Sequence, residues 1–97
     1  MKRKLTLKQY KDVMQGFFPV HKPVIVRVNR LKDEGSCAET AKRFYVTINR
    51  ELSLSEQKDV LQHEWAHMKA GWTTKQQHTD VWGVWYARIY RKMYEEE

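Results

Sequence analysis

The stretch of sequence that decides the fold reads SLSEQKDVLQHEWAHMKAG and runs from Ser53 to Gly71. Ser53 and Glu56 have the spacing of a capping box, in which each side chain hydrogen-bonds to the other residue's backbone N–H at the start of a helix. Gly71 suits the end of that helix, because glycine readily adopts the left-handed backbone conformation that terminates helices. The sequence therefore predicts a helix from Ser53 to Lys69 or Ala70.

A candidate metal site lies inside this helix, in the motif HEWAH of residues 63–67. The spacing places His63 and His67 on one helix face, with Cβ atoms about 5–6 Å apart, so both imidazoles can bind one ion. Imidazole suits Zn²⁺, and a catalytic zinc usually has three protein ligands and an open position for water. Glu64 lies about 100° further round the helix, where it can take a proton from zinc-activated water. The motif therefore predicts a catalytic zinc site with Glu64 as general base.

The third zinc ligand must come from outside this helix. His78 is the best candidate, because a chain that turns back after Gly71 can bring its side chain to the same ion. Asp80 is the alternative, since a carboxylate can also complete a zinc site. If Asp80 is not a ligand, it can accept a hydrogen bond from a ligating histidine and orient the ring. We predict His63, His67 and His78 as the ligand set.

The N-terminal part of the chain is predicted to form a helix from about Leu5 to Phe17. Thr6 and Gln9 match a capping box, and Pro19 lies just beyond the expected end. Apolar residues also recur at helical spacing. These residues are Leu7, Tyr10, Met14 and Phe17.

Two segments rich in β-branched and aromatic residues, Val24–Val28 and Arg43–Ile48, are predicted to be strands. The segment Leu31–Ala38 between them contains aspartate, glutamate and glycine and is interpreted as a turn. We expect the two strands to pair antiparallel, since a parallel pair would need a longer crossover, usually a helix.

A last helix is predicted from about Thr79 to Tyr94. Its apolar residues share one face and are expected to lie in the core. They are Trp82, Trp85, Tyr86, Ile89 and Met93. The expected order is helix, strand, strand, helix, helix, which is an α+β domain with a short antiparallel sheet.

The composition limits the kinds of protein this chain can be. Its 97 residues are enough for one domain, and 41% hydrophobic residues are too many for intrinsic disorder. The single cysteine, Cys37, excludes an intramolecular disulfide. No apolar segment is long enough for a membrane span, and none has the form of a signal peptide. We therefore expect a cytoplasmic protein that does not enter a membrane.

The net charge of +6 raises the question of a nucleic-acid partner. Basic residues near the N-terminus and in the last helix are suited to phosphate groups, and ordinary solvated surface is the alternative. These residues are Lys2, Arg3, Lys4, Lys8, Lys11, Arg88, Arg91 and Lys92.

The segments LQHEWAHMKAGW and HTDVWGVWYARIY resemble the SprT-like (Spartan-type) zinc metalloproteases. That family has an HExxH motif, an aromatic residue a few positions later, and a third histidine that opens a helix with aromatic residues. The matching residues here are His63, Glu64, His67, Trp72 and His78, with Trp82 as the aromatic residue after the third histidine. Thr79 stands where the family usually has glycine.

The resemblance covers roughly Phe44 to Tyr90 and is strongest to minimal family members encoded by phages. It implies that residues 1–97 form a single SprT-like metallopeptidase domain with a zincin-like fold and Zn²⁺ as cofactor. Its substrate would be a protein or peptide, and we expect the extended substrate chain to pair with the strand edge at Phe44–Ile48. Four side chains stay open as donors to the oxyanion: Tyr45, Tyr86, Tyr90 and His21.

Two other functions fit the same residues. In a zinc-stabilised nucleic-acid- or protein-binding module, the histidines would hold a small domain together without catalysis. In a metal-free interaction protein, the motif would have arisen by chance. Glu64 favours the peptidase over the binding module, because a purely structural zinc site has no use for a base at that position.

Overall fold

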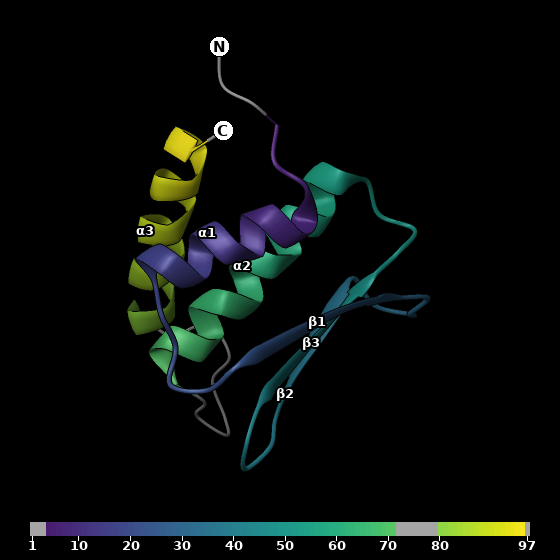
Figure 1. The fold of residues 1–97 in the computed structure, drawn as a ribbon, viewed down its shortest axis with the longest axis horizontal. Helices are drawn as coiled ribbons and strands as arrows, with labels where there is room; N and C mark the ends of the chain where they lie inside the picture. Colours follow the sequence, from purple (N-terminus) through teal and green to yellow (C-terminus); the bar gives the residue numbers. More distant parts are fainter. Residues whose placement is uncertain (1–3, 72–79, 97) are drawn as a thin grey trace.

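The computed structural model describes residues 4–71 and 80–96. Within these residues the chain is a small α+β domain of three helices and one mixed sheet of three strands (Figure 1). In chain order the elements are α1 (Leu7–Phe17), β1 (Val24–Asn29), β2 (Gly35–Glu39), β3 (Phe44–Asn49), α2 (Leu54–Ala70) and α3 (Asp80–Glu96).

The two predicted capping boxes are confirmed. Gln9 N–H donates to Thr6 Oγ1 at 3.1 Å, and Thr6 N–H donates to Gln9 Oε1 at 2.9 Å. The corresponding distances between Ser53 and Glu56 are 3.2 and 3.0 Å. Thr6 is thus the cap of α1. The helix begins at Leu7, two residues after the predicted start at Leu5.

The end of α2 also follows from a local interaction. Gly71 has a φ of +84°, a backbone conformation that residues other than glycine rarely adopt. Its N–H donates to the carbonyl of His67 at 3.0 Å. The last helix, α3, runs from Asp80 to Glu96, two residues past the predicted end. Thr79, its predicted first residue, lies outside the described residues.

The sheet differs from the prediction in its strand order. β3 lies in the middle, parallel to β1 and antiparallel to β2, so the expected antiparallel pairing of Val24–Val28 with Arg43–Ile48 is wrong. The segment Leu31–Ala38, interpreted as a turn, contains most of β2. Its residues, Gly-Ser-Cys-Ala-Glu, have weak strand propensity, and they form a strand because β3 supplies a backbone partner. The chain between β1 and β3 therefore provides the antiparallel strand itself.

A glycine lets β2 approach the helix layer. A Cβ atom at Gly35 would collide with a methyl group of Val60 in α2 and would lie 3.1 Å from the carbonyl oxygen of Thr47. The missing side chain therefore allows the first residue of β2 to pack directly against α2.

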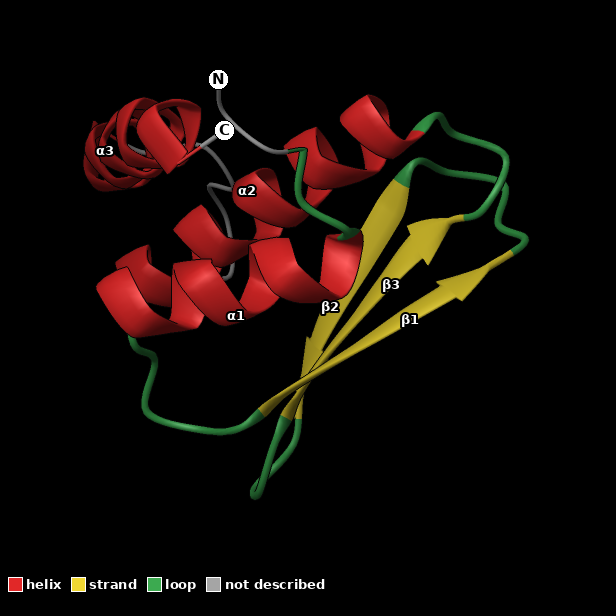
Figure 2. Cartoon of the chain, turned by 45° about the horizontal axis from the view of Figure 1, so that its top comes forward, coloured by secondary structure: helices red, strands yellow, loops and turns green. Residues whose placement is uncertain are grey.

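The helices cover one face of the sheet (Figure 2). α2 lies between the sheet and α3, and α1 packs on both α2 and α3. The core contains the alternate residues of β3 that face the helices, together with buried side chains from each helix. The largest of these side chains are Trp65, Phe44, Met14, Ile48, Leu61, Ile89 and Met93.

The predicted apolar stripes face the core with one exception. Ile89 and Met93 of α3 are fully buried, and Trp82 of the same stripe packs at the edge of the core. Phe17, grouped with the stripe of α1, is 48% exposed instead, and the ammonium group of Lys92 lies 4.2 Å from its ring centroid. None of the helices described here is long and apolar enough to cross a membrane.

Candidate metal centre

The middle of α2 brings three potential metal ligands together. One ligand atom from each of His63, Glu64 and His67 lies within 4.8 Å of the other two, so the group can hold a metal ion. The imidazole rings of His63 and His67 are 4.9 Å apart between centroids, as their spacing of one helical turn predicts. His67 is buried and His63 is half-buried, so an ion bound there would be partly shielded from water.

The third predicted ligand is not placed by the structure. His78 lies outside the described residues, as does Trp72. Asp80, the alternative, is the exposed first residue of α3 and is not a member of the cluster that the described residues form. The two imidazole nitrogens fit Zn²⁺, which in a catalytic site takes one more protein ligand, and the neighbouring Glu64 carboxylate can lie beside such an ion without binding it.

Trp82 connects the two histidines to α3. Its ring centroid lies 5.0 Å from that of His63 and 5.5 Å from that of His67. Its indole N–H also donates to the backbone carbonyl of His63 at 3.2 Å. Trp82 therefore packs on both imidazoles and holds the start of α3 beside the cluster. The sequence assigned this residue to an apolar stripe and to the SprT-like pattern, whereas its contact with both histidines depends on how α3 packs on α2.

Glu64 is buried on the side of α2 that faces β2. Only 8% of the residue is exposed, and this burial raises the pKa of its carboxyl group to about 7. Burial also raises the pKa of the Cys37 thiol on β2 to about 12, with a smaller effect from the negative charge of Glu64. A carboxyl group with a pKa near neutrality can both accept and return a proton at physiological pH.

A hollow of about 350 Å³ opens beside His63 and Glu64, between α2 and the start of β2. Its lining residues come from the β1–β2 connection, from β2 and from one face of α2. They are Asp33, Glu34, Gly35, Asp59, Val60, His63 and Glu64. The hollow therefore gives a ligand access to the cluster from the β2 side of the molecule.

The substrate edge predicted from the sequence is wrong. β3 has β1 on one side and β2 on the other, so Phe44–Ile48 has no edge to which another chain could be added. The two edges of the sheet belong to β1 and β2, and β2 is the strand that packs next to the hollow.

The hydrogen bonds at the ends of the β2–β3 hairpin show which backbone groups the β2 edge exposes. Asn49 N–H donates to Glu34 O, and Thr40 N–H donates to Arg43 O, each at 2.8 Å. In an antiparallel ladder, alternate residues bond to the partner strand and those between them direct N–H and C=O outward. The outward residues of β2 are Gly35, Cys37 and Glu39.

Two of the proposed oxyanion donors lie on α3. The hydroxyl of Tyr86 donates to Asp59 Oδ1 at 2.6 Å, and burial, together with this hydrogen bond, raises the pKa of the phenol. Tyr86 is therefore already engaged in tying α3 to α2. Tyr90 is one helical turn further along α3 and is 52% exposed, with its ring stacked on that of Tyr86 at 6.4 Å.

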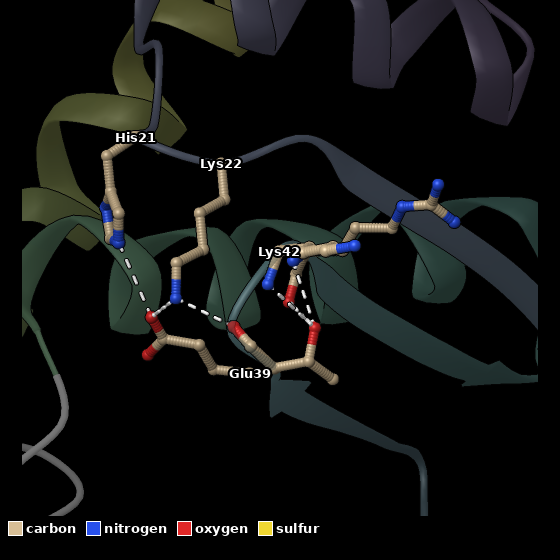
Figure 3. A network of polar contacts seen from close by, with 6 residues as sticks. His21, Lys22, Glu39 and Lys42 are labelled. Atoms are coloured by element: carbon tan, nitrogen blue, oxygen red, sulfur yellow. Dashed lines mark hydrogen bonds and ion pairs between the residues drawn. The ribbon is translucent and has the colours of Figure 1, made fainter.

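The other two candidate donors lie elsewhere. Tyr45 alternates with the buried residues of β3 and faces the side of the sheet opposite the helices, where the guanidinium of Arg27 lies 4.6 Å from its ring centroid. His21 is paired with Glu39 at 3.4 Å, next to Lys22, which also bonds to Glu39 (Figure 3). This network ties the segment before β1 to the β2–β3 hairpin.

The basic residues considered for nucleic-acid binding make several contacts within the protein. Lys8 pairs with Asp12 at 3.6 Å, and Arg88 lies 5.5 Å from the ring centroid of Trp85. Lys92 lies 3.8 Å from Glu95 and from Glu96. Lys2 and Arg3 lie outside the described residues. The positive charge of α1 and α3 is thus partly offset by neighbouring carboxylates.

Comparisons of the chain with protein-family models, with curated proteins and with solved structures gave no match. The function therefore has to be inferred from the geometry of the cluster and its surroundings.

Proposed function

We propose that this protein is a zinc-dependent peptidase of the SprT-like type, with a zincin-like arrangement of the HExxH helix beside an antiparallel edge strand. The observation that carries the proposal is the cluster of His63, Glu64 and His67, whose ligand atoms lie within 4.8 Å of one another and of which His63 and Glu64 line a hollow next to β2. If the two histidines had come together by chance, there would be no reason to find a buried carboxylate and an exposed strand edge next to them.

His63 and His67 would hold the zinc ion, with His78 as the proposed third ligand. Bound zinc would lower the pKa of a water molecule and polarise the carbonyl of the scissile peptide bond. Trp82 supports the two imidazoles, because its ring packs against both and its N–H holds the backbone at His63. Such support fixes ring orientation, on which ligand strength depends.

Glu64 would act as the general base. Its position one residue after His63 places the carboxylate beside the two imidazoles, within reach of a water molecule in the hollow. It takes a proton from the attacking water and passes it to the nitrogen of the departing amine, so the carboxyl group ends the cycle as it began.

The substrate would lie along β2 as an added strand. The outward backbone groups of Gly35, Cys37 and Glu39 can exchange hydrogen bonds with an extended peptide. Because β2 borders the hollow, this peptide would run past Glu64. The main chain of the substrate provides these bonds, so we expect unfolded proteins to be cleaved and folded ones to resist.

The proposal is tested by incubating the full chain with casein, an unfolded protein substrate, after removal of metal and after addition of Zn²⁺. We expect cleavage with zinc, loss of cleavage with a chelator, and recovery when zinc is restored. His67→Ala should lose both zinc and activity, whereas Gln15→Ala, a half-buried residue of α1 that belongs neither to the cluster nor to the hollow, should keep both.

Zinc bound at one ion per chain without cleavage of casein or of other unfolded proteins would overturn the peptidase and support the zinc-stabilised binding module. A chain that binds no zinc would overturn both functions. Retention of full zinc affinity by His78→Ala, with loss in Asp80→Ala, would reassign the third ligand to Asp80.

A further inference from the structure

The second edge of the sheet, formed by β1, lies on the opposite side of β3 from β2 and has no part in the proposed peptidase site. Phe44 N–H donates to Pro23 O, and Arg50 N–H donates to Asn29 O, each at 2.9 Å. In a parallel ladder, residues that bond to the partner strand alternate with residues whose N–H and C=O point away. The outward residues of β1 are Val24, Val26 and Val28.

An apolar groove runs along this edge, between β1 and α1. Its lining residues are Leu7, Lys8, Lys11, Ile25, Val26 and Val28. Ile25 and Val28 are 36% and 41% exposed, although isoleucine and valine are usually buried. An exposed strand edge with large apolar side chains favours pairing with another chain, and many proteins protect such edges with charges, prolines or bulges.

The groove carries positive charge. Lys8 and Lys11 lie on its α1 side, whereas the guanidinium of Arg27 lies over the Tyr45 ring on the opposite face of the sheet. Asp12 offsets Lys8 through an ion pair at 3.6 Å in which both side chains are largely exposed. Two lysines against one carboxylate leave the α1 side of the groove positive, so a chain with acidic residues would be attracted to it.

We propose that the β1 edge binds an extended segment of a partner protein in which acidic and apolar residues alternate. The segment would add a fourth strand to the sheet, with hydrogen bonds to the outward groups of Val24, Val26 and Val28. Successive side chains of the bound strand point to opposite faces of the sheet. Its acidic side chains would therefore lie beside Lys8 and Lys11, and its apolar side chains would lie on the open face, near Ile25.

A second copy of this chain is a poorer occupant. Antiparallel pairing of two β1 strands around a two-fold axis would place both α1 helices on the same face of a continuous sheet. Lys8 and Lys11 of one copy would then face the same residues of the other, and like charges at close range oppose association.

The experiment measures the fluorescence anisotropy of a labelled peptide, as long as β1, of alternating valine and glutamate. A peptide of alternating valine and lysine serves as its control. The protein is the full chain carrying Glu64→Gln, so that the peptide is not cleaved. We expect the acidic peptide to bind and the basic one not to. Charge reversal by Lys8→Glu together with Lys11→Glu should weaken binding of the acidic peptide about tenfold, since each exposed charge contributes modestly.

Two proline variants separate the two edges. Val26→Pro removes an outward N–H from β1 without removing a bond of the β1–β3 ladder, and Cys37→Pro does the same on β2. Val26→Pro should abolish peptide binding in a chain whose circular dichroism is unchanged, while Cys37→Pro should keep it. If Val26→Pro unfolds, the lysine double variant on the surface of α1 still decides the outcome.

Equal binding of the acidic and basic peptides, or unchanged affinity in the lysine double variant, would overturn the proposal. A dimer in sedimentation that Val26→Pro converts to a monomer would also overturn it and would assign the edge to a second copy. Because the assay needs neither zinc nor catalysis, failure of the peptidase proposal would leave its result unaffected.

Discussion

At the residue scale, Trp82 of α3 contacts both imidazoles of the candidate metal centre and the backbone carbonyl of His63. Trp82→Phe removes the hydrogen bond to the carbonyl of His63 but keeps an aromatic ring over the imidazoles, whereas Trp82→Ala removes both. We expect zinc affinity to fall about tenfold or more in Trp82→Ala and less in Trp82→Phe, because groups that orient ligands commonly contribute this much. Competition with a coloured chelator measures both affinities. Equal affinity in all three proteins would contradict this role.

Gly35 is the residue on which the approach of β2 to α2 depends. Gly35→Ala should lower the free energy of unfolding by about 1–3 kcal/mol, because the added methyl group meets Val60 and the backbone at Thr47. Gly16→Ala is the matched control: it lies in α1 with open space around it and should stabilise the protein by about 0.5–1 kcal/mol. Urea denaturation of the three proteins tests the pair. A destabilisation shared by both variants would argue against a specific contact at Gly35.

At the scale of elements, the network of His21, Lys22 and Glu39, which joins the segment before β1 to the β2–β3 hairpin, predicts that the stability of the protein depends on pH. The hydrogen bond from Lys22 is the main cause of a lowered pKa for the Glu39 carboxyl group. A pKa that is lower in the folded state adds stability above the unfolded value, about 4.3, and this stability is lost as the pH falls through the folded value.

Glu39→Gln should therefore be less stable than the native chain at pH 7, and the difference should shrink as the pH falls below the unfolded value and vanish once the folded carboxyl group is protonated as well. Thermal melts at several pH values measure it. Glu51→Gln removes a carboxylate whose ion pairs, at 3.5 and 3.9 Å, are more exposed, and should change stability less. A difference for Glu39→Gln that grows as the pH falls would contradict the assignment.

The helix ends were predictable because their determinants are local. The pairs Thr6–Gln9 and Ser53–Glu56 contain both partners of each capping box within four residues of sequence. β2 was missed because its residues favour a turn on their own, and only pairing with β3 makes them a strand. The parallel pairing of β1 and β3 was not predicted for the same reason, since the missed strand β2 is part of the connection between them.

The same distinction applies to the candidate site. The proximity of His63, Glu64 and His67 follows from helical periodicity and could be predicted. The burial of Glu64 beside β2 and the packing of Trp82 on both imidazoles could not, because each depends on contacts between elements that are far apart in the sequence.

At the scale of the whole molecule, a bound metal should matter for stability because the domain is small and has no disulfide. A ligand at 100 times its dissociation constant stabilises the folded state by about 2.7 kcal/mol. For a domain of this size, that corresponds to a rise in Tm of roughly 10–20 °C. Thermal melts with zinc and with chelator test this, and His67→Ala should show no difference between them. A shift of the same size in His67→Ala would place the stabilising zinc elsewhere.

The central claim is that the cluster on α2 is catalytic, and the most direct test compares the native chain with Glu64→Gln at equal zinc occupancy. Metal analysis establishes one zinc per chain in each sample, and mass spectrometry follows cleavage of casein. We predict that both proteins bind zinc and that only the native chain releases peptides, with a loss of at least about 100-fold in rate for Glu64→Gln. Equal rates in the two zinc-loaded proteins, or cleavage by neither, would contradict the claim.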